Sequence, residues 1–433
     1  MSNQQQASIG QADHTGTAPS LADYGAQTTA VLSALAACHG ALRLQLASAP
    51  GQIPAADWDA LLALQAAPTP FMRHAYLQAM HASGSAVADS GWQPQFLALW
   101  QGDCLMAACP LYLKSHSYGE YVFDWAWARA YAEHGLDYYP KALIAVPFTP
   151  VPGSRLLARS PAWRQALLQL AVAWADDNAL SSLHLLLGDE ADLACAEAQD
   201  MMLRDGVQFH WQNRAQLQPG AADWHSFEDF LASLAQDKRK KIRAEQRKVA
   251  QAGVCFRWAR GADITPQDWQ FFYHCYERTY LEHGNAPYLT PAFFADMAHT
   301  MPEHWLLFIA EQDGQPIACS LIGLQLDATG QPQVAYGRYW GALRRVDCLH
   351  FDACYYQPLQ WCIDHGVQRF EGGAQGEHKM ARALLPSPTV SAHWLAHPAF
   401  ADAVQRFLDR ESLGMQDYLQ ELALRNPLRR SAS

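Results

Sequence analysis

The sequence predicts a mixed α/β protein in which one folding unit occurs twice. Five short segments recur in the same order along the 433 residues. Within each copy, strand-like apolar runs alternate with longer helix-like stretches, which is the pattern of a mixed α/β fold. Half of the residues are hydrophobic and 11% are aromatic, so the chain can bury sizeable cores. We therefore predict two α/β domains after an N-terminal extension.

Each copy begins with a predicted helix and a predicted β-hairpin. TPFMRHAYLQAM (69–80) and APYLTPAFFADM (286–297) lie 217 residues apart and share a proline, two aromatics, an alanine and a final methionine. FLALWQGDCLMAA (96–108) and LFIAEQDGQPIAC (307–319) lie 211 residues apart. Each consists of two apolar runs around a Gln/Gly/Asp turn, which predicts a hairpin.

Three later matches complete the two copies. They are YGEY (118–121) with YGRY (336–339), Trp174 and Asp177 of a helical stretch with Trp361 and Asp364, and His210-Trp211 of a late strand with His393-Trp394. The separation falls from 218 residues at the first match to 187 and then 183 at the others. This drop predicts an extra segment of about 31 residues in the first copy after Tyr121, at about 122–160.

These matches set the expected domain boundaries. Residues 1–50 form an extension that is partly disordered or helical, in which AVLSALAACHGALRLQLASA is compatible with an amphipathic helix. Residues 51–222 form the first domain, and residues 223–433 form the second, which we predict to be catalytic.

Charge and cysteine content exclude several classes of function. The net charge is -11 and the pI is near 5.9, which disfavours a broad nucleic-acid footprint, and we expect no DNA partner. The ten cysteines include no CxxC pair, so neither a metal site nor a disulfide scaffold is expected. The N-terminus lacks a signal-peptide pattern, and no uncharged apolar run reaches the roughly 18 residues of a membrane span. We predict a cytoplasmic protein.

Several literal motifs resemble one known family. They are PLYLKSHSYGEYVFDWAWARAY and YYPKALIAVPFTPVPGSRLL in the first copy, and YGRYWG, LHFDACYYQ, GAQGEHK and SAHW in the second. Over residues 52 to 412 the chain resembles the FemAB-like N-acyltransferases, which are linked to peptidoglycan biosynthesis or recognition and have a tandem GNAT fold. It departs from the family at MARALLP, where a glycine and an aromatic are expected near Ala383 and Leu384, and at Asp352, where Glu is usual. It also lacks the long heptad insertion of the bridge-forming members.

The stretch GAQGEHKMAR (373–382) is the strongest candidate site. The repeat aligns Glu371–Glu377 with His184–Glu190, so this glycine-rich turn occurs in the second copy alone. Glycines let a backbone approach a ligand closely, and Gln, Glu, His and Lys supply donors, acceptors and a group that titrates near neutrality. The alternative is a solvated corner between a strand and a helix.

Acyl transfer to an amine needs a proton acceptor and donors for the developing oxyanion. We predict Glu377 or His378 as the acceptor, with His350 as the competitor. The alternative for His350 is a buried histidine bonded to Asp352 or to the backbone. The resemblance implies that the oxyanion donors come from the strand AYGRYWG (335–341). The further substrate-binding residues that we predict in this copy are Tyr336, Arg338, Tyr339, Trp340, Asp352, Tyr355, Gln375, Lys379 and Arg382.

Three of these residues are candidate anion ligands. Arg338, Lys379 and Arg382 are suited to a phosphate or carboxylate of donor or acceptor. The Tyr355-Tyr356 pair either stacks on a ligand or packs in the hydrophobic core. The interval ALRRVDC (342–348) has no glycine after Gly341, so the pyrophosphate loop of a simple acetyl-CoA enzyme is absent or degraded.

The first copy offers a second candidate binding region. Its residues are Lys114, His116, Ser117, Glu120, Tyr121 and Lys141, which lie among aromatics. This mixture suits a wall that binds sugar or peptide, or equally a structural polar network.

DKRKKIRAEQRKVAQAG (237–253) is predicted to be an amphipathic helix with Arg239, Arg243 and Arg247 on one stripe. The stripe is either simply solvated or a docking face for a tRNA acceptor stem, an acyl-carrier protein or a nucleotide-linked precursor.

The leading hypothesis is therefore an N-acyltransferase that transfers an acyl or aminoacyl group to an amine, with no tightly bound cofactor. The donor is acyl-CoA, acyl-carrier protein or aminoacyl-tRNA, and the acceptor is a small-molecule or peptide amine. A second hypothesis is a non-catalytic module that recognises a peptidoglycan-like peptide or glycan, and a third, weaker one is RNA binding through residues 237–253.

Overall fold

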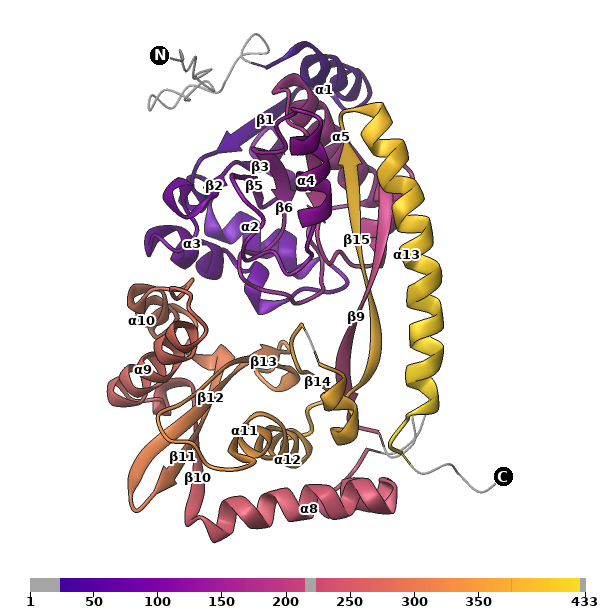
Figure 1. Cartoon of the computed structure of the whole chain (residues 1–433). Coiled ribbons are helices and arrows are strands. Elements are labelled where there is room, and N and C mark those ends of the chain that lie inside the picture. Colours follow the sequence, from indigo (N-terminus) through magenta and orange to yellow (C-terminus); the bar gives the residue numbers. More distant parts are fainter. Residues whose placement is uncertain (1–23, 215–222, 375, 429–433) are drawn as a thin grey trace, which may run out of the picture.

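The computed structural model describes residues 24–214, 223–374 and 376–428, which form two β-sheets covered by helices (Figure 1). The strands of the first half are β1 (Leu42–Ala47), β2 (Trp92–Pro94), β3 (Phe96–Gln101), β4 (Cys104–Cys109), β5 (Leu111–Lys114), β6 (Lys141–Ile144), β7 (Leu157–Ala158), β8 (Ser182–Leu185) and β9 (Met202–Gln212). Those of the second half are β10 (Val254–Arg260), β11 (Trp305–Gln312), β12 (Gln315–Leu326), β13 (Pro332–Ala342), β14 (Arg369–Glu371) and β15 (Leu385–Leu395).

Helices pack on both sheets. Those of the first half are α1 (Ala26–His39), α2 (Ala55–Ala63), α3 (His74–Ala82), α4 (Trp125–Glu133), α5 (Pro161–Asp177) and α6 (Glu190–Glu197). Those of the second half are α7 (Phe227–Ser233), α8 (Gln236–Gln251), α9 (Pro266–Glu282), α10 (Pro291–Thr300), α11 (Leu349–Phe351), α12 (Gln357–Asp364) and α13 (Pro398–Leu424). A π-helical turn at Asp352–Tyr356 joins α11 to α12. Within the described residues, no helix is long and apolar enough to cross a lipid bilayer.

The same strand arrangement occurs in both halves, which confirms the predicted mixed α/β fold with a tandem GNAT-like duplication. Each half has a hairpin (β3–β4 and β11–β12), an antiparallel neighbour (β5–β6 and β12–β13) and a parallel pair (β6–β8 and β13–β14). A long antiparallel strand ends each half, namely β9 and β15. The two predicted hairpins are confirmed, and α5 and α12 end at the matched residues Asp177 and Asp364.

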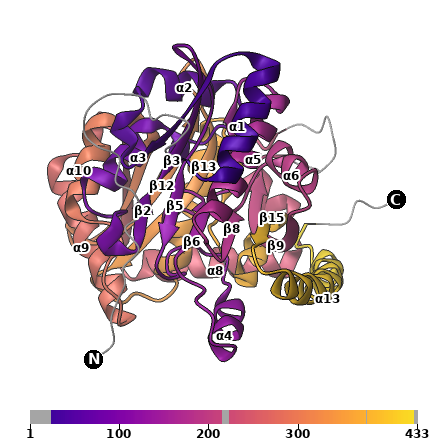
Figure 2. The same cartoon turned by 90° about the horizontal axis from the view of Figure 1, so that it is seen from above.

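The two halves exchange their last strands. The larger sheet has the order β10-β11-β12-β13-β14-β9-β15-β8-β6-β5-β2. β9 of the first half therefore pairs with β14 of the second, and β15 of the second half pairs with β8 of the first. β9 and β15 also pair with each other along most of their length, and α13 lies beside them (Figures 1 and 2). One sheet of eleven strands thus runs through both halves.

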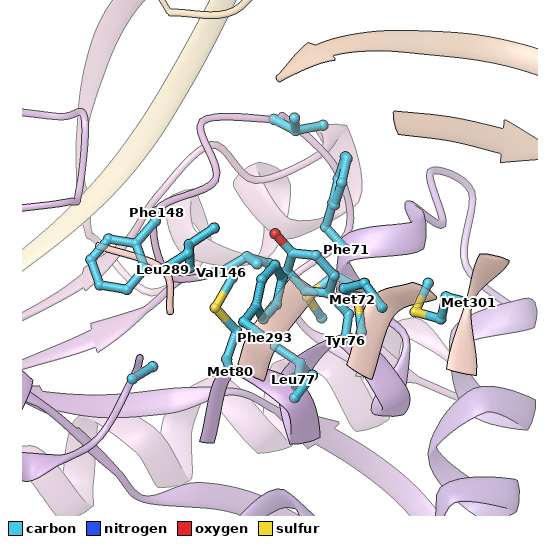
Figure 3. Close-up of a cluster of buried hydrophobic side chains, with 14 of the residues drawn as sticks. Phe71, Met72, Tyr76, Leu77, Met80, Val146, Phe148, Leu289, Phe293 and Met301 are labelled. Carbon is cyan, nitrogen blue, oxygen red and sulfur yellow. The ribbon is translucent and has the colours of Figure 1, made fainter. Parts of the chain in front are cut away.

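An approximate two-fold axis relates the halves. Gly206 lies directly opposite Thr389 in the β9–β15 pair, and these residues are 183 apart, the separation of the matched His-Trp pairs. Around the axis, α3 and α10 pack against each other, and Phe71, Tyr76 and Phe293 belong to one buried apolar cluster (Figure 3). The helices that were predicted from the first repeat therefore meet at the interface.

Proline 110 explains why the first half divides between two sheets. In the second half, β12 runs without interruption and pairs with both β11 and β13. In the first half, Pro110 separates β4 from β5, and a proline has no N–H to donate to a neighbouring strand. β4 consequently belongs to the smaller sheet, of order β1-β3-β4-β7, and β5 to the larger one.

The structure corrects one of the five repeat matches. Residues 118–121 lie in the loop between β5 and α4, whereas residues 336–339 lie in β13. The strand equivalent to β13 is β6, because each has an antiparallel neighbour on one side and a parallel one on the other. The extra segment of the first copy therefore comprises residues 115–140 and precedes the matched strand. A four-residue Tyr-Gly-x-Tyr pattern is too short to fix a register.

The N-terminal extension also differs from the prediction. The stretch expected to form one amphipathic helix forms α1, then a turn, then β1. Gly40 ends α1 with a positive φ of 83°, which glycine adopts at low cost. β1 pairs with β3, and α1 packs on α5, so these residues are part of the first half's core. Residues 1–23 lie outside the described residues.

Candidate functional site

A cavity opens where β13 and β14 diverge. The two strands pair in parallel over three residues only, Val334–Tyr336 with Arg369–Glu371. Beyond this point they enclose a cavity of about 120 Å³. Its lining residues are Ser320, Gly337, Arg338, Tyr339, Trp340, His350, Cys354, Tyr355, Phe370 and Gly372. We call it the donor cavity, for the role proposed for it below.

A β-bulge shapes this cavity. Leu321 of β12 lies opposite Tyr339, and the next residue, Ile322, lies opposite Gly337, so Arg338 is the extra residue. A bulge bends the strand and redirects its side chains. A Cβ atom on Gly337 would lie 3.2 Å from the Phe370 ring, so glycine lets the strands approach just before they separate. The strand that we expect to supply oxyanion donors therefore lines the cavity, and its role stays a prediction.

Of the three predicted proton acceptors, His350 lines the donor cavity. Its ring centroid is 5.4 Å from that of Trp340 and 5.8 Å from that of Tyr355. Burial and the neighbouring charges of His378, Arg382 and Lys379 lower the pKa of His350 to about 4. The imidazole is therefore neutral near pH 7 and able to accept a proton.

His378 lies at the edge of the same site. It is exposed, and its Nε2 is 3.2 Å from the hydroxyl of Tyr355, which lines the cavity. Burial raises the pKa of Tyr355, so this hydroxyl keeps its proton near neutral pH. His378 thus reaches the cavity through Tyr355.

Glu377 points away from the cavity. Its carboxylate accepts hydrogen bonds from the hydroxyl of Tyr418 at 2.6 Å and from Nη1 of Arg425 at 3.0 Å, both near the C-terminal end of α13. Its side chain is 48% exposed. Glu377 fastens the turn to α13, and the structure does not bring it to the position of a proton acceptor.

The two cations of this turn are buried and already bonded. Lys379 Nζ donates to the carbonyl of Gly373 at 3.0 Å, and burial lowers the pKa of this lysine to about 8. Arg382 Nη2 lies 2.9 Å from Glu245, and its guanidinium stacks 3.8 Å from the centre of the Phe351 ring. Arg382 therefore fixes α8 to the turn. Gln375 lies outside the described residues.

Three further candidates, on β13 and on the turn that joins α11 to α12, form hydrogen bonds within the chain. Arg338 Nη2 donates to the carbonyl of Phe148 at 3.0 Å and to Thr149 Oγ1 at 3.2 Å, so it joins the second half to the first. The Tyr336 hydroxyl donates to Gln325. Asp352 accepts a hydrogen bond from Gln357 rather than from His350, and burial raises its pKa to about 6.

Several polar residues of the first copy form a buried network. Lys141 is fully buried, and its Nζ donates to Ser117 and Glu120, each at 2.8 Å, and pairs with Asp124. Lys114 is also buried, with its Nζ 3.7 Å from the centre of the Trp92 ring. These contacts are those of a structural polar network, and a binding role for these side chains stays a prediction.

The remaining two candidates of that wall lie nearer the surface. His116 is half-buried, and its Nδ1 accepts a hydrogen bond from the backbone N–H of Tyr118. Tyr121 is the predicted residue of this copy that lines a cavity.

That second cavity, of about 230 Å³, lies on the two-fold axis and we call it the axial cavity. It is lined in equivalent pairs from the two copies, which are Leu187 with Ala374, Gly206 with Thr389, and Gln208 with Ser391. The other lining residues are Tyr121, Val122, Phe123, Pro150, Arg204, Asp205, Val207, Glu411 and Met415. Both halves and α13 therefore build it.

The two cavities lie on either side of one turn. Gly372 lines the donor cavity, and Ala374, two residues later, lines the axial cavity. Burial raises the pKa of Tyr121 in the axial cavity, and Tyr339 and Arg338 of the donor cavity are near enough to influence this pKa as well. Molecules bound in the two cavities would meet near this turn.

The sequence reasoning missed Glu371 and His210. Glu371 is fully buried, burial raises its pKa to about 7, and its Oε2 has no hydrogen-bond partner among the described residues. His210 Nε2 lies 3.8 Å from that oxygen and 3.2 Å from Gln208 Oε1 of the axial cavity. The repeat held the signal, because it aligns Glu371 with His184 and His210 with His393. In the sheet, Glu371 lies opposite His210, and His184 lies opposite His393.

The two pairs of parallel strands, β6–β8 and β13–β14, differ in the space beyond their ends. Beyond β6 and β8, the place of the donor cavity is taken by Val146, Phe148, Leu186 and Leu187, all buried in the shared core. Among the described residues, no group of three or more His, Cys, Asp or Glu side chains is arranged to hold a metal ion.

The fold and the cavity between diverging strands define a tandem GNAT-like protein. The sequence matches the model of the FemAB-like family, described as peptidoglycan biosynthesis/recognition, over residues 49–430. Because this match spans most of the chain, the protein belongs to the FemAB-like family.

Several solved structures are similar to it. They include FemX (9% identity, 82% of this chain and 98% of that chain, TM-score 0.49), L-PGS from Bacillus licheniformis (10%, 84% and 99%, 0.49) and a tandem GNAT protein from the clavulanic acid biosynthesis pathway (15%, 83% and 99%, 0.43). A comparison with curated proteins gave no significant match.

Proposed function

We propose that this protein is an N-acyltransferase that joins an acyl or aminoacyl group to an amine. The observation that carries the proposal is the donor cavity between β13 and β14, which contains His350 and adjoins the axial cavity at residues 372–374. The corresponding place in the first half is filled by apolar side chains. The second half is therefore proposed as the catalytic one.

The donor is an activated acyl ester or thioester carried by CoA, an acyl-carrier protein or a tRNA, and it acts as a co-substrate. A cavity of about 120 Å³ between two strands suits a narrow, extended group rather than a bulky ring system. Backbone N–H groups of β13 on the side where β14 diverges are available to the acyl carbonyl.

The proposed reaction needs one proton transfer. The amine nitrogen attacks the acyl carbon, a C–N bond forms, and the bond from carbon to the donor's sulfur or oxygen breaks. Neutral His350 takes the proton from the nitrogen and returns it to the leaving group. The Tyr355 hydroxyl, which keeps its proton, is a donor for the oxyanion beside the N–H groups of β13.

The acceptor is proposed to occupy the axial cavity. Asp205 and Glu411 supply carboxylates to an ammonium group, and Arg204 supplies a guanidinium. Arg204 is held by Glu411 through two hydrogen bonds, at 2.8 and 2.9 Å, so both signs of charge are fixed at this position. An amine from a peptidoglycan-related or amino-acid-containing precursor fits these charges.

The test is acyl transfer by purified protein. We would incubate it with a pool of amines and each of the three donor classes, and follow by mass spectrometry any amine whose mass rises by an acyl increment. H350A should lower kcat by about 10²–10⁴-fold, the usual contribution of general base catalysis. E377Q is the matched control and should retain activity. Equal activity of H350A and the unmodified protein would exclude His350 as the proton acceptor.

A glycan-recognition role is the second candidate, because aromatic side chains gather beside the axial cavity. Tyr118, Phe123 and Trp125 are 56%, 44% and 38% exposed, and the ring centroids of Tyr118 and Trp125 are 5.0 Å apart. Such rings provide flat surfaces for the apolar faces of sugars. Glycan binding that persists while no donor yields a product would favour this role.

A further inference from the structure

A basic surface adjoins the donor cavity. It consists of Lys240, Lys241, Arg247 and Lys248 of α8, and of Arg344 and Arg345 in the loop between β13 and α11, all of them exposed. We call it the α8 basic surface. α8 runs below α11 and α12, at the end of the molecule opposite the first half (Figure 1).

The buried side of α8 fixes this surface next to the cavity. Val249 packs in one cluster with Leu349, Val346 and Trp340, and Trp340 lines the donor cavity. Glu245, from the same side of α8, pairs with Arg382 of the turn at 377–382. The α8 basic surface therefore cannot move independently of the donor cavity.

Most of its charges are not neutralised within the chain. Lys241 is 4.0 Å from Glu245, and Arg344 donates to Gln312 at 3.4 Å. Among the described residues, Lys240, Arg247, Lys248 and Arg345 have no ion-pair partner, and Asp347 is the nearby exposed carboxylate of the loop. In a protein of net charge -11, such a local excess of cations indicates an anionic partner.

The chemistry of the loop argues against free CoA as that partner. A pyrophosphate is normally held by backbone N–H groups of a glycine-rich turn at a helix N-terminus. Here the chain from Ala342 to Cys348 has no glycine, and Cys348 itself has a positive φ of 67° just before the helix. The adenosine diphosphate half of CoA would find side-chain cations but no backbone cradle.

The extent of the surface argues against a tRNA. Binding to a structured nucleic acid requires cations spread along many phosphates, and its affinity depends strongly on salt. These six cations cover one helix and one loop of an acidic protein. They suit a small acidic protein that presents its acyl group on a thin phosphopantetheine arm, because such an arm needs a narrow cavity and no nucleotide site.

We propose that the acyl donor is a thioester of an acidic carrier protein, which docks on the α8 basic surface and extends its phosphopantetheine arm between β13 and β14. This inference rests on the proposed function. The acceptor nitrogen forms a bond to the acyl carbon, the C–S bond breaks, and the sulfur leaves as the thiol of the arm after receiving the proton of the amine.

Binding is tested first, with a fluorescently labelled holo-acyl-carrier protein as the probe and anisotropy as the readout. R247E/K248E should raise the Kd at least tenfold. R406E/R410E, which reverses two exposed cations of α13 at the side of the molecule, should leave it unchanged. Equal binding to both variants, or tight binding of tRNA in place of the carrier protein, would overturn the proposal.

Turnover with a short donor separates this inference from the proposed function. Acyl-pantetheine carries the arm without the protein, so R247E/K248E should transfer its acyl group at the unmodified rate while losing at least tenfold in kcat/KM with the acyl-carrier protein. Unequal loss of this kind supports docking on α8. A variant that loses both donors equally, or a protein that uses acyl-CoA and acyl-carrier protein equally well, contradicts it. Failure of every donor to yield an amide would refute the proposed function instead.

Discussion

Tyr76 and Phe293 hold equivalent positions in the two copies and contact each other edge to face, with ring centroids 5.4 Å apart and planes at 90°. The same axis passes between Gly206 and Thr389, which pair directly in the sheet. A core that includes both rings and an exchanged pair of strands therefore unite the halves. Neither half can separate from the other without exposing apolar surface.

We expect this shared core to make the protein unfold as one unit. F293A removes a fully buried ring at the axis and should lower the free energy of unfolding by about 3–5 kcal/mol. Urea denaturation followed by tryptophan fluorescence and by circular dichroism should give coincident single transitions. L424A changes a side chain that is 77% exposed and should shift stability by about 0.5 kcal/mol at most. Two separate transitions would show that the halves are independent.

Two buried lysines of the first half should respond to substitution in opposite ways. Burial disfavours the charge of Lys141, but Glu120 and Asp124 outweigh it and raise its pKa. K141M leaves both carboxylates buried without their cation and should destabilise the protein by about 3–5 kcal/mol. Chemical denaturation at pH 7 measures the loss, and a change below 1 kcal/mol would contradict the buried network.

K114M should stabilise the protein at neutral pH. Burial lowers the pKa of Lys114 to about 7, below the value of about 10.5 in the unfolded chain, so folding costs most at pH 7 and below, where the lysine is charged in both states. Methionine removes that cost, and we expect a gain of roughly 1–4 kcal/mol at pH 6 that disappears above pH 10.5. A loss of stability at pH 6 would show that the contact with Trp92 outweighs burial.

The carboxyl group of Glu371 should make stability depend on pH in the opposite sense to a carboxyl group whose pKa is lowered by folding. Its pKa is about 7 in the folded protein, mainly through burial, and about 4.5 when unfolded. Between these values the unfolded chain binds fewer protons, so the free energy of unfolding falls as pH rises from 4.5 to 7. Arg369 at 2.9 Å, His210 at 3.8 Å and the neighbouring Tyr336 are the groups that face it.

E371Q should remove this dependence. The difference in unfolding free energy between pH 5 and pH 8 should shrink by roughly 3 kcal/mol relative to the unmodified protein, at about 1.4 kcal/mol per pKa unit. Parallel curves for E371Q and the unmodified protein would place the pKa of Glu371 near its ordinary value.

The repeat could be read from the sequence because the matched segments form the same elements in both copies, such as the hairpins and the helices that end at Asp177 and Asp364. The exchange of β9 and β15 could not be read from the sequence. Strand alternation records which side chains are buried, and the same faces are buried whichever strand lies next to them. Partner choice depends on contacts between residues that are far apart in the sequence.

The candidate site was predicted in outline for a similar reason. Residues 337–340 of the motif YGRYWG line the donor cavity together with His350. The sequence could single them out because glycine and histidine have identifiable uses beside a strand. Glu377 and Lys141 were less predictable, because a polar side chain in a polar run gives no sign of whether it faces solvent, a cavity or a buried partner. The partners of these two residues are supplied by α13 for Glu377 and by the loop at 115–124 for Lys141.

The donor cavity itself is tested by filling it. Cys354 lines it, and C354F adds a ring in the space between β13 and β14. We expect saturation with acyl-pantetheine to be lost, with kcat/KM at least tenfold lower, while binding of the amine acceptor in the axial cavity is kept. Donor binding can be followed by isothermal titration calorimetry with acyl-pantetheine. C255F, at an exposed cysteine on β10, is the matched control and should bind the donor normally.

Because an added ring can also strain a packed region by about 1–3 kcal/mol, the thermal midpoints of both variants are measured alongside. Unchanged donor binding by a folded C354F protein would place the donor elsewhere and remove the main support for the second half as the catalytic one.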